Sequence, residues 1–389
     1  MTYNPSMRLF FVADGRSPIT QNWIRYFVER GDEVHLASTF ACSLDFPVSG
    51  LYTMPVAFSG MKKPSATPAP SSARTLGLRT AIRQWLGPLT IPRAARSLRV
   101  LLERVQPDLV HALRIPYEGM LAADAYMGAP LVVSVWGNDF TLHAPSTPLM
   151  RHYTQWALKA ADALHADCWR DIRLGKQMGF ATDRPTLVTP GNGGIRTDIF
   201  HPPSTLAKQP IVVNPRGFRA YVHNEAFFRA IPLVLEKRPD ARFVCSSMAG
   251  ETQALQWIQE FGIGHAVTLN PPMPHAQMAE VFRAAQVVVS PSFHDGTPNS
   301  LLEGMACGCF PVAGDLESIR EWITHGKNGL LVDSSSPHAI AEGILTALEN
   351  KELREQAAGL NAKIIATRAE YGACMTQVEG FYRKVAGVK

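Results

Sequence analysis

Residues 287–312 read VVVSPSFHDGTPNSLLEGMACGCFPV, and their order of apolar and polar segments indicates the fold class. A continuous β-branched run ends at Ser290, as expected of a parallel strand that is buried on both faces. A polar loop follows, and we predict that a helix begins near Pro298, because proline suits the first turn of a helix. A second apolar run begins at Phe310. Strand, loop, helix and strand in this order are typical of a doubly wound α/β sheet, which binds ligands at the carboxyl ends of its strands.

The start of this predicted helix is a candidate anion site. The exposed backbone N–H groups of Asn299, Ser300 and Leu301 would point away from the helix, where they suit a phosphate. Asp295 lies in the loop before the helix and Glu303 lies on it, with seven residues between them. Two carboxylates flanking an anion site suit a nucleotide sugar, which has hydroxyls at both ends of its diphosphate. The residues alone equally allow Asp295 to cap the helix and Glu303 to pair with an arginine.

The same alternation of strands and helices runs through both halves of the chain. The continuous apolar runs are interrupted by stretches of helical periodicity and by glycine turns, which predicts two parallel sheets. The expected strands are 7–13, 33–37, 108–111, 130–135, 162–166 and 186–189 in the first half, and 211–214, 241–246, 266–269, 286–290, 310–313 and 329–332 in the second. The expected helices are 19–30, 117–126, 224–237, 251–261, 275–284, 337–363 and about 368–385.

The length and one proline-rich segment predict two domains. A chain of 389 residues exceeds what one hydrophobic core usually organises. Residues 200–210 contain three prolines and no periodic pattern, so they are interpreted as a linker. The predicted domains are 1–203 and 204–370, with 371–389 as a C-terminal helix that packs back towards the first. The predicted fold class is therefore α/β, with two Rossmann-like, doubly wound, parallel-sheet domains facing a cleft.

The positive charge of the chain is local. There are 38 Lys and Arg against 33 Asp and Glu, a net charge of +5, but residues 61–104 hold nine basic residues and one acid, Glu103. The rest of the chain, with 29 basic and 32 acidic residues, is slightly negative. Little aromatic interleaving and no known fold signature in this stretch argue against nucleic acid. The Arg-rich stretch 74–104 with Trp85 suits an anionic membrane surface, or it is an ordinary helix packing Leu98, Leu101 and Leu102 on the sheet.

The cysteines and the apolar runs exclude several classes of protein. The close pair Cys307 and Cys309 lacks a second Cys/His pair at metal-ligand spacing, so no metal site is expected. No uncharged apolar run approaches the ~20 residues of a membrane-spanning helix, and the N-terminus does not resemble a secretory signal. The sequence predicts a cytoplasmic protein, with peripheral attachment to the inner face of the membrane if the basic stretch binds lipid.

The stretch after Ser290 resembles the E-x7-E signature of the family 4 glycosyltransferases, which are retaining enzymes with the GT-B fold. The similarity runs over 292–312 and continues through Glu321 and 326–332. Weaker similarity extends over nearly the whole chain, including residues 191–202 near the linker. The resemblance implies that Asp295 holds hydroxyls of the donor sugar and that Glu303 holds the ribose of the nucleotide. The remaining residues implied on the donor side of the helix are Thr297, Asn299, Ser300 and Leu301.

The chain departs from the family pattern at three positions. The first acid of the signature is Asp295 rather than Glu. The family arginine that stabilises the leaving diphosphate corresponds to Arg216, but the lysine five residues later is replaced by Tyr221. Arg219 is then either a substitute for that lysine or a surface residue. The family often has a histidine in the first domain where this chain has Trp136, so no catalytic histidine is assigned there and Trp136 is a candidate on the acceptor side.

Two further residues of the first half are candidates. Asp139 would orient the acceptor or cap the segment that follows it. Gly15, after the first strand, would let its loop approach the diphosphate without a Cβ clash, or it serves only a tight turn.

The resemblance implies a retaining hexosyl- or N-acetylhexosaminyl-transferase without metal or cofactor. Its expected partners are a nucleotide sugar and a glycan or lipid-linked acceptor, with bacterial cell-surface polysaccharide synthesis as the expected context. Two alternatives remain: a nucleotide-sugar 2-epimerase, which also uses two Rossmann-like domains, and a catalytically silent GT-B binding subunit, which the three departures favour.

Overall fold

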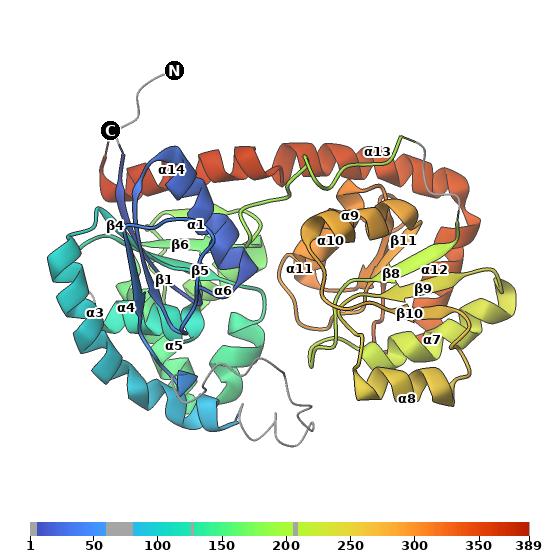
Figure 1. The fold of residues 1–389 in the computed structure, drawn as a ribbon, viewed down its shortest axis with the longest axis horizontal. Coiled ribbons are helices and arrows are strands. Elements are labelled where there is room, and N and C mark those ends of the chain that lie inside the picture. Colours follow the sequence, from blue (N-terminus) through green and yellow to red (C-terminus); the bar gives the residue numbers. More distant parts are fainter. Residues whose placement is uncertain (1–5, 60–80, 126–127, 205–208, 389) are drawn as a thin grey trace. The chain divides into compact units, whose positions relative to one another are not determined.

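The computed structural model describes residues 6–59, 81–125, 128–204 and 209–388. Its contacts divide the chain into two units (Figure 1). The first unit holds residues 1–193 and 375–389, and the second holds 194–374.

The first unit is built on a seven-stranded parallel sheet with the strand order β3-β2-β1-β4-β5-β6-β7. Its strands are β1 (Arg8–Ala13), β2 (Glu33–Ser38), β3 (Gly50–Thr53), β4 (Leu109–Ala112), β5 (Leu131–Val135), β6 (Ala163–Ala166) and β7 (Thr186–Val188). Its helices are α1 (Pro18–Arg30), α3 (Ile91–Val105), α4 (Met120–Asp124), α5 (Pro148–Ala160) and α6 (Trp169–Gln177), joined by most of α14 (Tyr371–Ala386).

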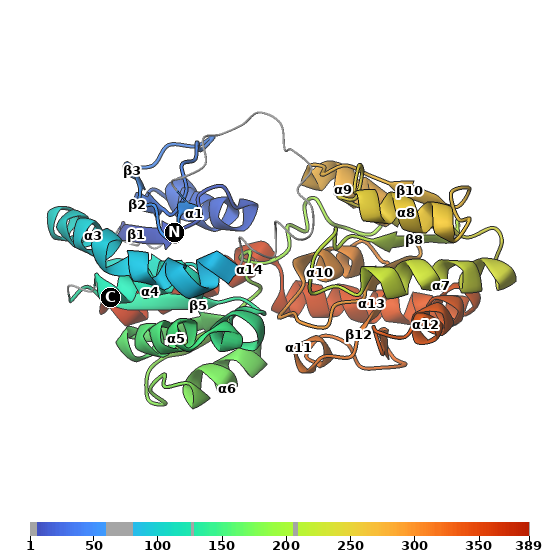
Figure 2. The same cartoon turned by 90° about the horizontal axis from the view of Figure 1, so that it is seen from below.

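Helices cover both faces of this sheet because its strands are apolar on both sides. Phe10 and Val12 of β1 belong to one core, to which α3, α4, α5 and α6 contribute. Phe11 faces the opposite side, where it contacts Phe27 of α1. Phe27 in turn stacks on Tyr382 of α14, with 5.0 Å between the ring centres. The helices can be followed around the sheet in Figure 2.

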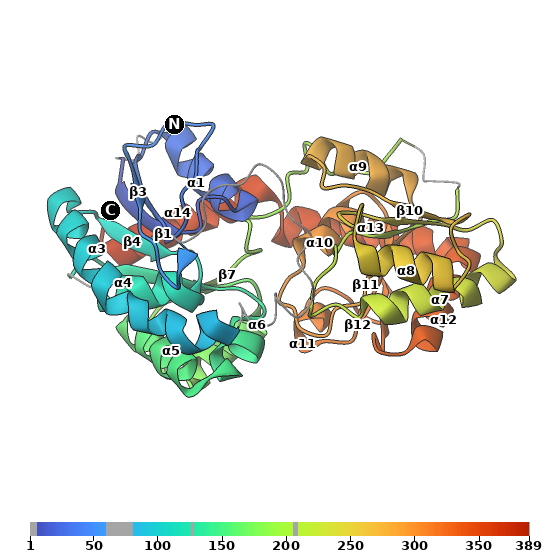
Figure 3. The same ribbon diagram turned by 60° about the horizontal axis from the view of Figure 1, so that its bottom comes forward.

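The second unit is built on a six-stranded parallel sheet with the order β10-β9-β8-β11-β12-β13. Its strands are β8 (Ile211–Asn214), β9 (Arg242–Cys245), β10 (Val267–Leu269), β11 (Val287–Ser290), β12 (Phe310–Gly314) and β13 (Leu330–Val332). One face carries α7 (Asn224–Lys237), α8 (Thr252–Glu260) and α12 (Pro337–Glu349). The other carries α9 (His275–Ala284), α10 (Asn299–Ala306), α11 (Glu317–Arg320) and much of α13 (Lys351–Arg368), as Figure 3 illustrates.

The predicted fold class of two doubly wound, parallel-sheet domains is therefore confirmed, and two of the predicted helices differ clearly from the structure. The helix predicted over 337–363 is interrupted at Asn350, whose side chain accepts a hydrogen bond from the Leu353 amide and starts a new helix. The helix predicted from residue 117 begins only at Met120, because Tyr117 adopts a left-handed backbone conformation with a φ of 71°.

The division between the units lies at Gly193 and Gly194, before the predicted linker at 200–210. Residues that follow Gly194 are held by the second unit: the Ile195 amide donates to the Ala369 carbonyl, and the Tyr371 amide donates to the Ile195 carbonyl. The chain returns to the first unit at Met375, within α14, rather than at the predicted residue 371.

A chain of buried hydrogen bonds fixes α14 in the first unit. The Tyr382 hydroxyl lies between Trp23 Nε1, which donates to it over 2.9 Å, and His111 Nδ1. His111 Nε2 continues to the Ser134 hydroxyl at 2.8 Å, which contacts His165 Nδ1. Burial lowers the pKa of both histidines, so the rings are neutral.

The variant Tyr382→Phe is expected to lower the free energy of unfolding by about 2–4 kcal/mol, because it leaves Trp23 Nε1 and His111 Nδ1 buried without a partner. Urea unfolding followed by tryptophan fluorescence measures the change. Tyr153→Phe on α5 is the control, since no hydrogen bond of that hydroxyl is found among the described residues. Equal stability of the two variants would contradict the prediction.

Candidate functional site

Each sheet reverses its strand order at one point, and candidate site residues gather at both points. In the second sheet the order runs outwards from β8 in one direction and from β11 in the other. The carboxyl ends of these two strands lead into the loops that carry Arg216 and Asp295. In an open α/β sheet, the crevice at such a reversal is where ligands bind. The fold therefore brings together two residues that lie far apart in the sequence.

Arg216 and Asp295 form an ion pair in the second unit. Arg216 Nη2 lies 2.5 Å from Asp295 Oδ2, and Arg216 Nη1 donates to the Ser300 hydroxyl over 3.2 Å. The loop itself is fixed because the Arg216 amide donates to Asn214 Oδ1. Arg216 Nε is buried and has no hydrogen-bond partner among the described residues. One guanidinium thus contacts the loop and the helix that the sequence identified as the two parts of an anion site.

The start of α10 matches the predicted position, with one difference. Pro298 caps the helix, and the amides of Asn299 and Ser300 have no backbone acceptor among the described residues. The Leu301 amide, predicted to share in the anion site, donates to the Pro298 carbonyl over 2.9 Å and is already used. The available donors at this helix terminus are therefore the first two amides, together with Arg216.

Glu303 lies on α10 as a buried carboxyl. It is 8% exposed, and burial raises its pKa to about 7, although the Arg216 cation acts in the opposite direction. The alternative in which Glu303 pairs with an arginine is not found among the described contacts, because the guanidinium of Arg216 bonds to Asp295 instead. Glu303 is therefore available to a ligand.

Thr297 and Arg219 are the remaining donor-side candidates in the second unit. The Thr297 hydroxyl accepts a hydrogen bond from Trp322 Nε1 over 2.9 Å and is buried. Arg219 is exposed, and its guanidinium donates to the Arg216 carbonyl and to the Tyr221 hydroxyl. Arg219 therefore neighbours Arg216 through the backbone and pairs with the tyrosine that stands in the family's lysine position.

Several small polar side chains at the strand ends were not predicted as site residues from the sequence. They share a position at or just after the last residue of a strand, and each has a buried polar atom without a partner in the described part of the chain: Asn214, Ser246, Ser290 and Ser292. A buried polar group without a partner costs free energy unless a ligand or water supplies one. These positions could have been predicted from the sequence, because a polar residue at the end of an apolar run marks the carboxyl end of a buried strand.

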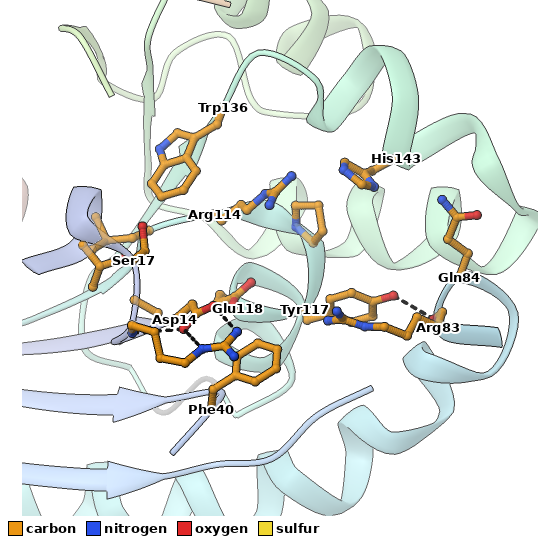
Figure 4. Close-up of a pocket in the computed structure, with 15 residues that line it drawn as sticks. Asp14, Ser17, Phe40, Arg83, Gln84, Arg114, Tyr117, Glu118, Trp136 and His143 are labelled. Carbon is orange, nitrogen blue, oxygen red and sulfur yellow. Dashed lines mark hydrogen bonds and ion pairs between the residues drawn. The ribbon is translucent and has the colours of Figure 1, made fainter. Parts of the chain in front are cut away.

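A pocket opens at the corresponding reversal of the first sheet, between β1 and β4 (Figure 4). Its volume is about 370 Å³. The loops after β1 and β4 supply Asp14, Arg16 and Arg114, and the segments beyond them supply Tyr117 and Glu118. Of the residues predicted for the first unit, only Trp136 lines this pocket.

Asp139 and Gly15 serve the architecture around the pocket. Asp139 is 1% exposed; its carboxylate accepts from the Trp136 amide and from Arg114 Nε, each over 3.0 Å. It therefore caps its own turn and positions Arg114. A Cβ on Gly15 would lie 2.5 Å from Cys42 Sγ and 3.0 Å from the Ser38 hydroxyl. This glycine is required for packing of the loop against its own unit.

Glu118 is the principal residue of this pocket that the sequence did not reveal. It is buried, and its carboxylate accepts a hydrogen bond from the Thr39 hydroxyl over 2.8 Å. Burial raises its pKa to about 7, an effect that Thr39 and Arg114 partly oppose. A carboxyl that is half ionised near neutral pH can accept or donate a proton in a hydrogen bond with a ligand hydroxyl.

Comparisons with known families agree with this architecture. The family described as "Glycosyl transferases group 1" matches residues 196–362, and the "Glycosyl transferase 4-like domain" matches residues 14–191.

Curated relatives cover only part of the chain. D-inositol 3-phosphate glycosyltransferase of Thermobispora bispora is 26% identical over 207 residues, 48% of this chain and 48% of its own length. The Paenarthrobacter aurescens protein of the same name is 29% identical over 46% of this chain and 41% of its own. The matched part thus spans about half the length of these relatives or less.

Two solved structures share the fold over almost the whole chain. Sucrose-phosphate synthase from Thermosynechococcus elongatus has a TM-score of 0.76 at 14% identity, covering 98% of this chain and 100% of that one. Anabaena HepE, solved in complex with UDP and glucose, has a TM-score of 0.72 at 17% identity, covering 97% and 100%.

Proposed function

Because the chain belongs to the family 4 glycosyltransferases with the GT-B fold, we propose that it transfers a sugar from a nucleotide-sugar donor to an acceptor hydroxyl. The observation that carries the proposal is the arrangement at the end of β8 and β11. There the guanidinium of Arg216, on the loop after β8, lies beside two unused amides at the start of α10, the helix that also carries the buried carboxyl of Glu303. These groups match the diphosphate and the hydroxyls of such a donor.

In the proposed mechanism the second unit holds the donor. Arg216 and the amides of Asn299 and Ser300 stabilise the negative charge that develops on the diphosphate as the sugar departs. Glu303 binds ribose hydroxyls, and Asp295 binds hydroxyls of the donor sugar. Transfer retains the anomeric configuration, with the leaving diphosphate accepting the proton of the acceptor hydroxyl on the face where the new bond forms. The protein then contributes positioning and electrostatic stabilisation.

The acceptor is proposed to be a glycan or a lipid-linked glycan that binds in the first unit. The donor base is proposed to be uridine, guanosine or adenosine. UDP is the first choice to test, since it is the nucleotide in the HepE complex.

The test is incubation of the full chain with UDP-, GDP- and ADP-sugars, with and without acceptor glycans, followed by chromatography of the products. We expect slow release of nucleoside diphosphate and free sugar with one donor class, and a glycoside when the acceptor is correct. A chelator arm tests the expectation that no metal is required. Accumulation of a 2-epimer from the donor alone would identify an epimerase. Donor binding without either product would identify a silent binding subunit.

A second proposal concerns the membrane. Part of the basic stretch 74–104 lies outside the described residues. In the described part, 81–104, several apolar side chains of α3 are buried, whereas large apolar side chains just before α3 are exposed. Leu98 and Leu102 of α3 are buried against the sheet, as an ordinary helix requires. Just before α3, four large apolar side chains are exposed to solvent: Ile82, Trp85, Leu86 and Leu89. The most exposed are Trp85, at 58%, and Leu89, at 62%.

We propose that this apolar set, flanked by the exposed Arg93 and Arg96, attaches the protein to an anionic lipid surface. Exposed aromatic and aliphatic side chains next to arginines are typical of interfacial attachment. None of the described helices is long and apolar enough to cross a membrane.

In a flotation experiment, the protein is expected to bind vesicles that contain phosphatidylglycerol and not vesicles of phosphatidylcholine alone. The double variant Trp85→Ser, Leu89→Ser should reduce binding about tenfold, because two exposed apolar groups no longer enter the lipid. Trp156→Ser on α5, which removes another exposed tryptophan of the same unit, is the matched control. Absence of binding to either vesicle contradicts the proposal.

A further inference from the structure

The pocket of the first unit contains an arginine whose charge no other described residue neutralises. Three arginines line it. Arg16 is paired with Asp14, with 2.8 Å between Nη2 and Oδ2, and Arg114 is paired with the buried Asp139. Arg83 forms no ion pair with a carboxylate among the described residues, and its Nε is buried without a hydrogen-bond partner.

Arg83 is held in place from two sides. Its guanidinium carbon lies 5.1 Å from the centre of the Tyr117 ring and 5.7 Å from that of Phe40. The Tyr117 hydroxyl donates to the backbone carbonyl of Arg83 over 2.7 Å, so the ring fixes the segment as well as the side chain (Figure 4). Tyr117 itself adopts a φ of 71° and a ψ of −51°, a strained conformation for a bulky residue that typically persists at binding sites. The guanidinium is therefore oriented before any ligand arrives.

The surroundings do not supply the missing negative charge. Burial, together with the cations Arg114 and Arg83, lowers the pKa of His143 to about 4, although Asp139 acts in the opposite direction, so this histidine is neutral. Glu118 is only partly ionised at neutral pH, because burial raises its pKa to about 7. With the Arg16 and Arg114 charges already neutralised, the free pocket carries an excess of positive charge.

We propose that this pocket binds an acceptor bearing an oxyanion, a phosphate or a carboxylate, and that Arg83 is the residue that contacts it. A guanidinium fork matches either anion with two parallel hydrogen bonds. A cavity of about 370 Å³ lies in the size range of small-molecule sites. The inference rests on the proposed function, since it specifies the chemistry of the acceptor. It also assigns one arginine of the basic stretch to the pocket rather than to the membrane.

The test is calorimetric titration with glucose, glucose 6-phosphate and glucuronate. The protein is first saturated with the nucleoside diphosphate that the donor panel selects, which occupies the second unit. We expect glucose 6-phosphate or glucuronate to bind at least tenfold more tightly than glucose. Equal affinity for all three sugars, or no binding of any, overturns the inference. Failure of the proposed function is a separate outcome, seen as absence of nucleotide binding, and the sugar titration is then performed on the free protein.

Variants of Arg83 locate the binding. Arg83→Gln is expected to weaken the anionic sugar about tenfold or more and to leave glucose unchanged, because one charge-assisted contact is lost. Arg83→Lys keeps the positive charge but not the two parallel donors of the guanidinium, so its affinity for the anionic sugar should lie between those of the native protein and Arg83→Gln. Arg151→Gln on α5 removes an exposed arginine of the same unit that does not line the pocket, and is the matched control. If Arg83→Gln and Arg151→Gln bind the anionic sugar alike, the assignment to Arg83 is wrong. If Arg83→Gln fails to fold, Arg83→Lys provides the comparison.

Discussion

The Arg216→Ala variant is expected to lower kcat for transfer by about 10²- to 10³-fold and to weaken donor binding. The reason is that Arg216 is the cation that contacts both the Asp295 loop and the first turn of α10. Loss of one preorganised donor to a developing negative charge typically costs about 2.7–4 kcal/mol of transition-state stabilisation. Initial rates of nucleotide release at saturating and limiting donor concentration separate the effect on kcat from that on KM.

Two variants accompany this measurement. Arg216→Lys retains the charge but cannot form both contacts, so its rate should be intermediate. Arg229→Ala on α7 removes an exposed arginine that pairs with Glu225, and it should leave the rate unchanged. A near-normal rate of Arg216→Ala would show that this arginine does not stabilise the leaving diphosphate.

The Glu303→Gln variant is expected to weaken donor binding about tenfold and to change the dependence of stability on pH. The folded-state pKa of Glu303 is about 7, above its ordinary 4.5. Between these values the unfolded chain is ionised while the folded protein keeps the proton. The free energy of unfolding therefore falls as pH rises through this window, by at most about 1.4 kcal/mol per pH unit for each such group. The glutamine variant lacks this share of the slope.

Glu118→Gln in the first unit is the matched control, because burial raises the pKa of that carboxyl to about 7 as well. Urea unfolding at pH 5 and pH 7.5 should show a smaller loss of stability in either variant than in the native protein. Only Glu303→Gln should weaken nucleotide binding. Native donor affinity should also rise with pH through 7, since the ionised carboxylate accepts hydrogen bonds from ribose hydroxyls. A native affinity without this rise contradicts the assigned role of Glu303.

The sheets could be predicted from the sequence because buried parallel strands are continuous apolar runs. β8 and α7 begin and end where the pattern placed them. α5 was missed because its buried face includes Thr154 and Ala157, which blur the helical periodicity. β3 was missed because it is a four-residue strand at the edge of the sheet, with exposed residues alternating along it. Both elements were missed because the sequence pattern does not show which of their residues are buried in the folded chain.

The two candidate sites differ in how far the sequence revealed them. In the second unit, Asp295, Ser300 and Glu303 lie within one short segment, so their spacing carried the information. The pocket of the first unit combines residues from several separate segments, which the fold alone brings together. Arg83 belonged to a stretch whose charge suggested a lipid surface, and nothing in its neighbours indicated Tyr117 as its contact.

The path of the chain has a consequence for biosynthesis. The first unit begins before the second and is completed after it, because Tyr382 belongs to residues 375–389. A ribosome therefore releases the entire second unit before it supplies the hydroxyl that joins Trp23 to His111. During that interval the nascent first unit holds unsatisfied polar groups and apolar side chains such as Phe27 that α14 does not yet cover, features that favour binding by chaperones. Synthesis of α14, rather than of the sheet itself, therefore sets the moment at which the first unit can become native.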